Sequence, residues 1–491
     1  MKRNIYMIIH EINEKKGGGT GICMNRTNLF NTKNYNSDVL TFDFKPNYKE
    51  IENKMKEIGK LNINSSIINM YDFFSTHNKK INSSIRINND EDIIKYISNN
   101  YHNTFKEENI NLDEYVLHTQ TKNYLKLVSG ANYIELDFSD FTLYRVKISN
   151  PENDERKEKY FSKDGFCYLY KYKKLSNNKT QSIYLIYKNY NFHFENEVGL
   201  ENYFLNLLIF SSNQAGEEPV FIIDGQGSLR RAQNLSKKNC KVYFVIHTNH
   251  LLKPYTSDSK FVLQKETVFK NIDQIDGLVV LTERQKKDIV NVYGKENKIF
   301  MIPNYIQKPK INKIPKNKNE IIIVSRLAKG KRIDKAIKIF SRVIKQVPSA
   351  KLKIYGDGNE KKNLQALINK LKLDDNVFLM GHTNEVMKKF SEANINIMTS
   401  ETEAFPSIII EALLCRTPTV SLDINYGPSD IINSNNGGIV VQNEDDMTNV
   451  LIDLLKNPRK ITKMGKNGRK NIITNYSHKN ILEKWEVMFE T

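Results

Sequence analysis

The chain has 491 residues and a formal net charge of +18, and 39% of its residues are hydrophobic. This length allows two or three domains, and the apolar runs are far shorter than a bilayer-spanning segment. The four cysteines, Cys23, Cys167, Cys240 and Cys415, are scattered and lack the spacing of a zinc site or a disulfide framework. We therefore expect a protein of the reducing cytoplasm.

The first 75 residues alternate between strand-like and helix-like segments. Residues 5–10 predict a buried strand, which a glycine turn and a helix from about Thr20 follow. Residues 39–44 predict another strand, 48–59 a helix, and 66–74 continue the pattern. Such alternation is typical of a parallel sheet with helices on both faces.

Residues 76–205 show a different pattern, in which apolar and polar residues alternate with a period of two. The apolar faces of two predicted strands comprise Ile134, Leu136 and Phe138 in the first, and Tyr144, Val146 and Ile148 in the second. This pattern predicts an antiparallel sheet inserted into the first α/β domain. Its edges offer a surface for a homo-oligomer, with a trimer as one option, or for an acceptor; the alternative is a subdomain packed on its own host.

The strand–helix alternation resumes at residue 219, and a second α/β domain begins near residue 319, after the basic stretch 308–318. The helix predicted at 332–347 has a clear amphipathic stripe. We predict an α/β fold with two doubly wound domains and four segments: residues 1–75 with 206–308, the insertion 76–205, residues 309–472, and a C-terminal helix at 473–491.

Two cations follow the apolar strand 321–324. Arg326 and Lys331 have the spacing R-x4-K in SRLAKGK. Arginine offers a planar fork of donors and lysine a mobile point charge, which together suit a diphosphate. The alternative is a solvated basic turn, a description that suits the adjacent Lys329 and Arg332.

Two carboxylates have the spacing E-x7-E in SETEAFPSIIIEALL. Glu403 lies on a predicted loop, and Glu411 lies about two turns into an apolar helix, where an unpaired carboxylate is costly. A ribose diol would give Glu411 a partner. The backbone N–H groups of Phe405, Ser407 and Ile408 at the start of this helix could bind phosphate or sugar hydroxyls.

Further candidates lie where predicted strands end, because ligands of open parallel sheets bind at the carboxyl ends of the strands. Gly17 and Gly18 follow the first strand and allow a phosphate or sugar to approach the backbone. His247 and Asn304 end later strands, and His247 could bond a sugar hydroxyl. His250 is a weaker candidate.

The two α/β domains, the glycine loop, R-x4-K and E-x7-E resemble glycosyltransferases of family 4, retaining enzymes with the GT-B fold of two Rossmann-like domains. The opening MIIHEINEKKGGG, the inserted β-rich region, VIHTNH and the stretch SETEAFPSIIIEALLCRTPTVSLDINYGPSD are similar to wall teichoic acid α-glycosyltransferases. The resemblance implies transfer of glucose, as in a poly(glycerol-phosphate) α-glucosyltransferase, or of N-acetylglucosamine. The donor would be a UDP-sugar and the acceptor an anionic poly(polyol-phosphate) chain.

The same resemblance implies a role for each site residue. Arg326 and Lys331 would hold the diphosphate, and Glu411 the ribose. Glu403 would bind the donor sugar or act at the reacting centre, and His247 would line the sugar site. Gly17 and Gly18 would approach the donor phosphates.

We expect no cofactor and no metal, because the chain shows no credible cluster of metal ligands; Asp90, Glu91 and Asp92 are interpreted as a solvated turn. The positive charge is spread along the chain, which favours a phosphate-rich polymer or the cytoplasmic face of a membrane over nucleic acid. Two other functions compete with this one. They are glycosylation of Ser/Thr-rich adhesins and non-catalytic binding of a polyanion.

Overall fold

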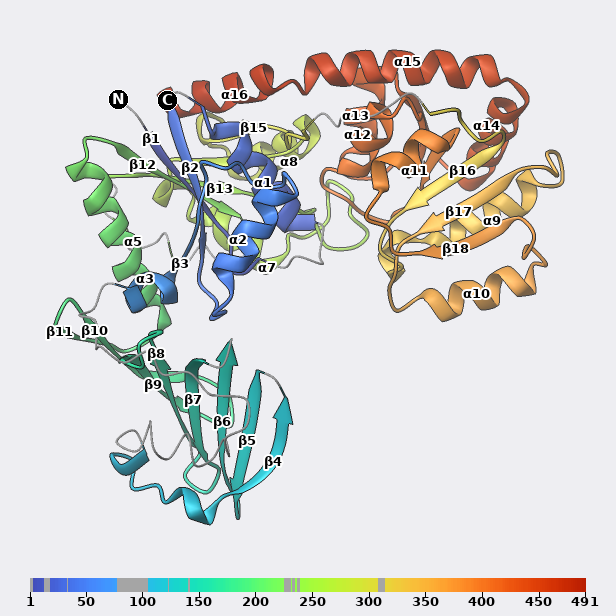
Figure 1. Ribbon diagram of the computed structural model, residues 1–491. Helices are drawn as coiled ribbons and strands as arrows, with labels where there is room; N and C mark the ends of the chain where they lie inside the picture. Colours follow the sequence, from blue (N-terminus) through green and yellow to red (C-terminus); the bar gives the residue numbers. More distant parts are fainter. Residues whose placement is uncertain are drawn as a thin grey trace. The chain divides into compact units, whose positions relative to one another are not determined.

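The computed structural model describes residues 3–12, 18–32, 34–76, 105–121, 123–139, 142–224, 231, 235, 239–307 and 314–491. Three β-sheets form its framework (Figure 1). The chain divides into two compact units. Unit 1 consists of Met1–Lys15, Lys33–Phe221 and Gly227–Lys241, and unit 2 of Lys16–Thr32, Ile222–Gln226 and Val242–Thr491.

The first sheet has seven strands in the order β15-β14-β13-β12-β1-β2-β3. The pairs β1–β2, β2–β3, β13–β14 and β14–β15 are parallel. Central strands such as β12 and β14 are almost wholly buried, as expected when helices cover both faces. The strands are β1 (Arg3–Ile8), β2 (Tyr35–Thr41), β3 (Ile67–Asn69), β12 (Glu218–Asp224), β13 (Lys241–Val245), β14 (Gly277–Val280) and β15 (Ile299–Met301).

Helical segments accompany these strands. They are α1 (Gly18–Phe30), α2 (Tyr48–Glu57), α3 (Met70–Thr76), α5 (Glu197–Gln214), α7 (Leu263–Lys270), η3 (Ile272–Gln274), α8 (Glu283–Tyr293) and η4 (Glu296–Lys298). Residues 66–74 continue the strand–helix alternation, as predicted, because β3 ends at Asn69 and α3 begins at Met70. The Asn69 side chain accepts hydrogen bonds from the backbone N–H groups of Tyr71 (3.0 Å) and Asp72 (3.2 Å), which starts helix α3.

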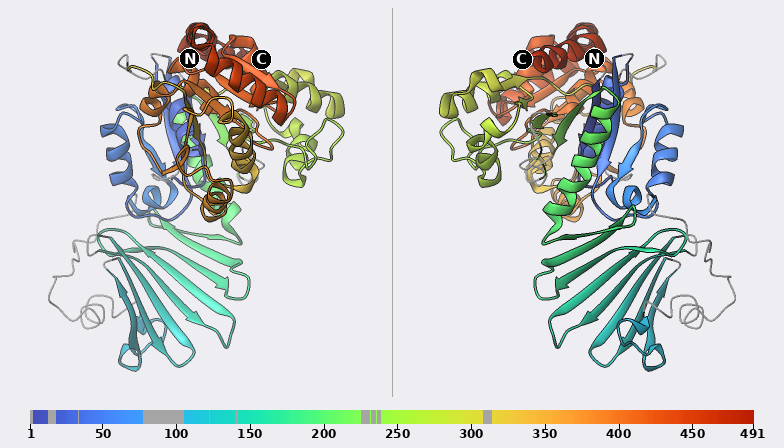
Figure 2. Two further views of the ribbon diagram at one scale, coloured as in Figure 1. Left: turned by 90° about the vertical axis from the view of Figure 1, so that its right-hand side faces the viewer. Right: turned by 90° about the vertical axis from the view of Figure 1, so that its left-hand side faces the viewer.

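The antiparallel sheet lies in unit 1 and has eight strands (Figure 2). Strands that follow one another in the chain are neighbours in the sheet, with β4 at one edge and β11 at the other. A short helix, η1 (Leu112–Glu114), precedes it. The strands are β4 (Val116–Thr121), β5 (Tyr124–Ser129), β6 (Asn132–Ser139), β7 (Thr142–Asn150), β8 (Glu155–Phe161), β9 (Cys167–Lys174), β10 (Thr180–Tyr187) and β11 (Tyr190–Phe194). The predicted antiparallel insertion is thus present.

One face of this sheet carries an apolar cluster that includes Ile134, Leu136 and Phe138, as the alternation predicts. In β7 the prediction is only partly right, because Leu143 rather than Tyr144 is buried with Val146. A register shift between Asp137 and Phe138 of β6 explains the difference. A bulge inserts one residue into the period of two and exchanges the two faces beyond it.

The second parallel sheet lies in unit 2, in the order β18-β17-β16-β19-β20-β21. Its order reverses between β16 and β19, which are hydrogen-bonded neighbours. Its strands are β16 (Glu320–Val324), β17 (Lys351–Tyr355), β18 (Val377–Gly381), β19 (Ile395–Met398), β20 (Thr419–Leu422) and β21 (Gly438–Val441). Its helices are η5 (Lys329–Lys331), α9 (Ile333–Val343), α10 (Lys361–Lys370), α11 (Val386–Glu392), α12 (Ser407–Leu414), α13 (Pro428–Asn435), α14 (Glu444–Lys456), α15 (Pro458–Asn475) and α16 (His478–Glu490).

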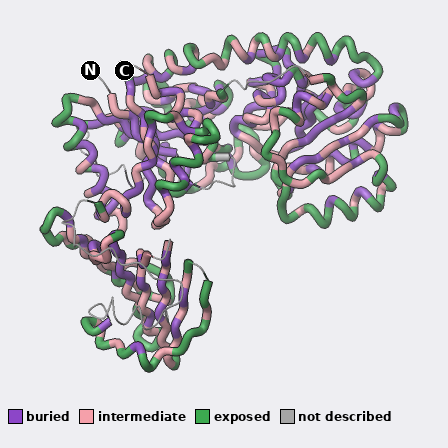
Figure 3. The backbone as a smooth tube through the Cα atoms, viewed as in Figure 1, coloured by how far each residue is buried: buried purple, intermediate pink, exposed green. Residues whose placement is uncertain are grey.

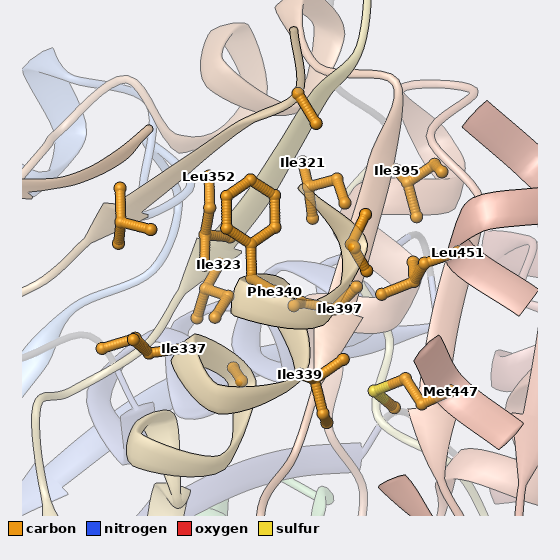
Figure 4. Packing of buried hydrophobic residues seen from close by; sticks show 14 of the residues in the cluster. Ile321, Ile323, Ile337, Ile339, Phe340, Leu352, Ile395, Ile397, Met447 and Leu451 are labelled. Carbon is orange, nitrogen blue, oxygen red and sulfur yellow. The ribbon is translucent and has the colours of Figure 1, made fainter. Parts of the chain in front are cut away.

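The core of this part packs α9 and α14 onto the sheet. Phe340 of α9 lies beside Ile323 and Leu352 (Figure 4), and Leu451 of α14 belongs to the same cluster. Figure 3 shows the strands as largely buried, whereas α10 exposes many residues. The amphipathic stripe predicted for 332–347 is confirmed in its central part, because Ile337 and Phe340 are fully buried, but the helix itself ends at Val343.

Helix α16 contacts α1, and both belong to unit 2. The ring centroids of Phe30 and Trp485 are 5.3 Å apart, and those of Phe30 and Phe489 are 5.8 Å apart. Within the described ranges, no helix has the length and apolar composition needed to cross a membrane. The proposed segment boundaries near residues 75, 205, 308 and 472 stay predictions.

Candidate active site

The R-x4-K and E-x7-E segments follow the two strands at which the strand order of the second sheet reverses. Arg326 and Lys331 follow β16, and Glu403 follows β19. The loops are tied by hydrogen bonds from Glu401 N to Gly330 O (2.8 Å) and from Thr399 Oγ1 to Arg332 O (2.9 Å). Ligands of doubly wound sheets bind at such a switch point.

Lys331 and Glu403 form an ion pair through Nζ and Oε1. Both side chains are partly buried, so solvent screens the pair less than it would at the surface. Arg326 is exposed, and in the described part of the chain its guanidinium has no carboxylate partner. The site therefore offers one cation held by a carboxylate and one that is available to a ligand.

Glu411 lies on α12 and is only partly exposed. Burial raises the pKa of its carboxyl to about 7, while a hydrogen bond from Ser407 lowers it. The N-cap of α12, Pro406, makes no side-chain capping bond. The first N–H groups of a helix have no acceptor within it, so those of Ser407 and Ile408 suit a ligand oxygen.

The side chains of Phe405 and Ile408 support the helix. Phe405 is buried, with its ring centroid 6.0 Å from that of Tyr476. Ile408 packs against the cluster that contains Ile322 and Phe390. Any role of these two residues toward a ligand is therefore confined to their backbone.

A second polar cluster joins the ends of β12, β13 and β15. Asp224 Oδ1 lies 2.7 Å from His247 Nε2 and 2.6 Å from Arg26 Nη1. Arg26 Nη2 also donates to Asn304 Oδ1 at 3.2 Å. Burial alone would raise the pKa of Asp224, but the charges and hydrogen bonds of Arg26 and His247 outweigh burial and lower it to about 2.

Three buried polar atoms of this cluster have no hydrogen-bond partner among the described residues. They are Asp224 Oδ2, His247 Nδ1 and Asn304 Nδ2. A buried polar atom without a partner is costly. A carboxylate oxygen, an imidazole nitrogen and an amide together match the mixed donors and acceptors of sugar hydroxyls.

The chain that follows His247 contacts the loops of the second sheet. Asn249 Nδ2 donates to Thr402 Oγ1 (3.0 Å) and to Asn425 O (2.7 Å), and Lys253 pairs with Glu401 at 2.8 Å. Thr402 precedes Glu403, so Asn249 links the chain beside His247 to the chain beside Glu403. All of these residues belong to unit 2.

Arg26 and Asn249 were missed by reasoning from the sequence. Arg26 is 4% exposed within a helix whose other buried residues are mostly apolar, and such a buried arginine needs a partner. Its position in the first helix was the available signal. Asn249 lies in VIHTNH, a segment considered only for its histidines.

His250 packs among aromatic side chains in the protein interior. It is fully buried, stacks on Tyr426 with centroids 5.6 Å apart, and contacts the edge of Phe261. Burial, followed by the charge of Lys265, lowers the pKa of His250 to about 3. The ring is therefore neutral near pH 7 and acts as part of the aromatic core.

The glycine loop is only partly covered by the structure. Gly17 lies outside the described residues, and Gly18 is the first residue of α1. Asp90, Glu91 and Asp92 also lie outside. In the described ranges, no group of three or more His, Cys, Asp or Glu residues is placed to hold a metal ion.

Comparison with known proteins identifies relatives of this chain. The family model "Glycosyl transferases group 1" matches residues 304–471. The chain is 30% identical to the poly(ribitol-phosphate) alpha-N-acetylglucosaminyltransferase of Staphylococcus aureus (strain COL), with full coverage of both chains. It is 28% identical to the poly(glycerol-phosphate) alpha-glucosyltransferase of Bacillus subtilis (strain 168), over 59% of this chain and 43% of the relative.

Solved structures give the same result. A crystal structure of an S. aureus TarM mutant in complex with Fondaparinux, alpha-GlcNAc-glycerol and UDP has a TM-score of 0.81 and 27% identity, with full coverage of both chains. Another TarM structure has a TM-score of 0.83 and 26% identity, covering 100% of this chain and 99% of its own. The predicted GT-B fold with an inserted antiparallel sheet is confirmed. The chain belongs to the wall teichoic acid α-glycosyltransferases.

Proposed function

We propose that this protein is a retaining glycosyltransferase that transfers a hexose from a UDP-sugar to the polyol-phosphate repeats of wall teichoic acid. The observation that carries the proposal is the meeting of Lys331 and Glu403 at the switch point of the second sheet, next to the exposed Arg326. This arrangement combines groups for a diphosphate and for a sugar within one site.

The donor would bind along the loops that follow β16 and β19. Arg326 and Lys331 would contact the diphosphate, and the first N–H groups of α12 would bind its oxygens or a sugar hydroxyl. Glu411 would accept hydrogen bonds from the ribose hydroxyls when it is ionised. Its raised pKa reflects the burial that such a partner would compensate.

Catalysis would rest on charge stabilisation. Cleavage of the bond from the anomeric carbon to the phosphate oxygen leaves negative charge on UDP, and Arg326 and Lys331 are fixed charges for that leaving group. The acceptor hydroxyl would attack from the same face, and the departing phosphate would take its proton. Glu403 would position Lys331 and contact the donor sugar.

The sugar ring would be held by the second polar cluster. In the part of the chain that the structure describes, three atoms of this cluster have no hydrogen-bond partner: His247 Nδ1, Asp224 Oδ2 and Asn304 Nδ2. Asp224 fixes the orientation of the His247 ring through Nε2. The imidazole can then accept a hydrogen bond from a sugar hydroxyl at Nδ1.

N-acetylglucosamine is the first donor sugar to test, because the relative matched over its full length is named for that sugar. Glucose is the alternative, in keeping with the B. subtilis relative. The acceptor would be poly(ribitol-phosphate) or poly(glycerol-phosphate). The net charge of +18 favours such polyanions.

The decisive test is mass spectrometry of purified poly(ribitol-phosphate) and poly(glycerol-phosphate) after incubation with each UDP-sugar separately. We expect a mass increase of one hexose or N-acetylhexosamine per modified repeat. The Lys331→Ala variant serves as the inactive control, and Lys329→Ala, on the same loop, as the active one. Modification of a Ser-rich peptide but of neither polymer would contradict the proposed acceptor and support the adhesin alternative.

A further inference from the structure

A cationic cavity lies at the amino ends of strands of the second parallel sheet, whereas the candidate active site lies at their carboxyl ends. Its volume is about 530 Å³. Among the residues that line it, Lys316 precedes β16, Asn394 precedes β19 and Arg416 precedes β20. The cavity is therefore at the amino ends of these parallel strands, whereas Arg326, Lys331 and Glu403 follow the carboxyl ends.

Four cations line this cavity: Lys316, Arg416, Lys466 and Arg469. No aspartate or glutamate is among the described residues that line it. Burial, and after it the charge of Arg416, lowers the pKa of Arg469, so the two guanidinium groups repel each other. Like charges gathered without a carboxylate create a local field that attracts an anion.

Of these four cations, only Lys316 has a side chain that forms hydrogen bonds with other described residues. Lys316 Nζ donates to Ala393 O at 2.6 Å and to Thr417 Oγ1 at 2.7 Å, near the end of α11. In contrast, the side chains of Arg416, Lys466 and Arg469 form no ion pair within the described part of the chain. Since Lys316 already donates a hydrogen bond to the carbonyl group of Ala393, Arg416, Lys466 and Arg469 are not needed to satisfy that group.

The backbone is built to bring these charges together. Arg416 has a φ of +59°, a left-handed conformation that normally favours glycine after a helix. Helix α15, which carries Lys466 and Arg469, packs closely at this point through Gly465. A Cβ on Gly465 would lie 2.2 Å from Arg416 O. A larger residue there would push α15 away and separate its cations from Arg416.

The apolar residues that line the cavity indicate which kind of molecule carries the anionic group. Ile314, Pro315 and Ile461 give the cavity an apolar side. Its volume is within the range of small-molecule sites. Guanidinium forks match phosphate oxygens, and the apolar side leaves room for a short carbon skeleton.

We propose that this cavity is a second anion site that binds the phosphate ester of a short polyol, such as one repeat of the acceptor polymer. Assignment of the polymer as its source rests on the proposed function, whereas binding of a polyol phosphate does not. An acceptor polymer bound in this cavity would stay attached while its other repeats reach the proposed active site. Two linked binding sites raise the effective concentration of the polymer at the second site.

The test compares binding of glycerol 3-phosphate, a short poly(glycerol-phosphate) chain and phosphatidylglycerol vesicles by calorimetry, with UDP saturating the active site. The key variant is Arg416→Gly, which removes the charge and suits the left-handed backbone. We expect it to unfold at the same or a higher temperature than the wild type and to bind glycerol 3-phosphate about tenfold more weakly. Arg459→Gln, on the exposed face of the same helix as Arg469, is the matched control and should bind normally.

Each arm has a defined meaning. Tighter binding of the polymer than of glycerol 3-phosphate assigns the polymer as source, and preferential binding of vesicles assigns a lipid headgroup. Equal weakening by Arg416→Gly and Arg459→Gln, or no binding of any phosphate ester, overturns the proposal. Arg416→Gly should keep transfer to a single-repeat acceptor and lose efficiency on long chains. If the wild type transfers no sugar at all, the proposed function fails, while the binding data still decide the cavity.

Discussion

Arg26 and Asp224 form a buried ion pair in which Nη1 lies 2.6 Å from Oδ1, with both side chains at most 7% exposed. The same oxygen of Asp224 accepts from His247, so a helix charge and a candidate sugar-binding residue depend on one carboxylate. Removal of one partner of such a pair leaves an uncompensated charge in the interior.

We therefore expect Asp224→Asn to lower the free energy of unfolding by about 3–5 kcal/mol, since Arg26 would keep its charge without a counter-ion. Urea denaturation followed by circular dichroism measures this change. Asp453→Asn is the control, because Asp453 pairs with Lys460 at the surface, where an ion pair contributes at most about 1 kcal/mol. An equal decrease in the free energy of unfolding in the two variants would show that the buried ion pair contributes no more to stability than the surface pair.

The proposed role of Arg326 and Lys331 toward the leaving group gives a second prediction. Arg326→Ala and Lys331→Ala should each lower kcat by about a hundredfold or more, as expected when a preorganised charge is removed. Lys329→Ala should have little effect, because this exposed residue lies between them on the same loop. Steady-state kinetics with a UDP-sugar measures all three, and near-normal turnover in both active-site variants would place the diphosphate elsewhere.

The Glu411 carboxyl should make donor binding depend on pH. Its pKa of about 7 means that it becomes ionised between pH 6 and 8, and an ionised carboxylate is the better acceptor for ribose hydroxyls. We expect the dissociation constant of the UDP-sugar to fall about tenfold over this range, since the diphosphate diester does not titrate there. In Glu411→Gln the constant should be independent of pH.

The same group links stability to pH. A folded-state pKa above the usual value favours the protonated form, so its stabilising contribution is complete at low pH and is lost as the pH rises through about 7. The midpoint of thermal unfolding of the free wild type should therefore fall more between pH 5.5 and 8 than that of Glu411→Gln. Parallel curves for the two proteins would contradict the raised pKa.

A further prediction concerns metal ions. If Arg326 and Lys331 carry the leaving-group charge, transfer should continue in excess EDTA at a rate close to that of the untreated protein. The measurement is product formation after dialysis against the chelator, with and without added Mg²⁺ or Mn²⁺. A strict requirement for either ion at the chemical step would refute this assignment of roles.

Self-association is the last prediction. Strand β4 forms one edge of the antiparallel sheet, and Val116 and Leu117 on it are 72% and 41% exposed. An apolar edge strand is a ready surface for pairing with another copy. Light scattering should show an oligomer that Val116→Lys dissociates. Val292→Lys, at a position 59% exposed on α8, should leave the oligomer intact, and a monomeric wild type would refute the idea.

The sequence predicted the fold class well because strand–helix alternation and strict periods of two are local signals. It also singled out Lys331 and Glu403 as candidates, since their motifs follow buried strands. It could not predict that they pair. Two other strands, β17 and β18, lie between β16 and β19 along the chain, and only the strand order of the folded sheet makes β16 and β19 neighbours. The register shift between β6 and β7 and the partners of Arg26 likewise depend on tertiary contacts that no local pattern contains.

Trp485 of α16 lies against Arg26, with its ring centroid 5.4 Å from the guanidinium carbon. During synthesis, Arg26 leaves the ribosome long before Trp485 does. Domains fold as they emerge from the ribosome. The surroundings of Arg26 are therefore complete only after α16 has been synthesised. A chain whose synthesis stops before this helix would therefore contain the loops of Lys331 and Glu403 but lack the aromatic ring that lies over Arg26.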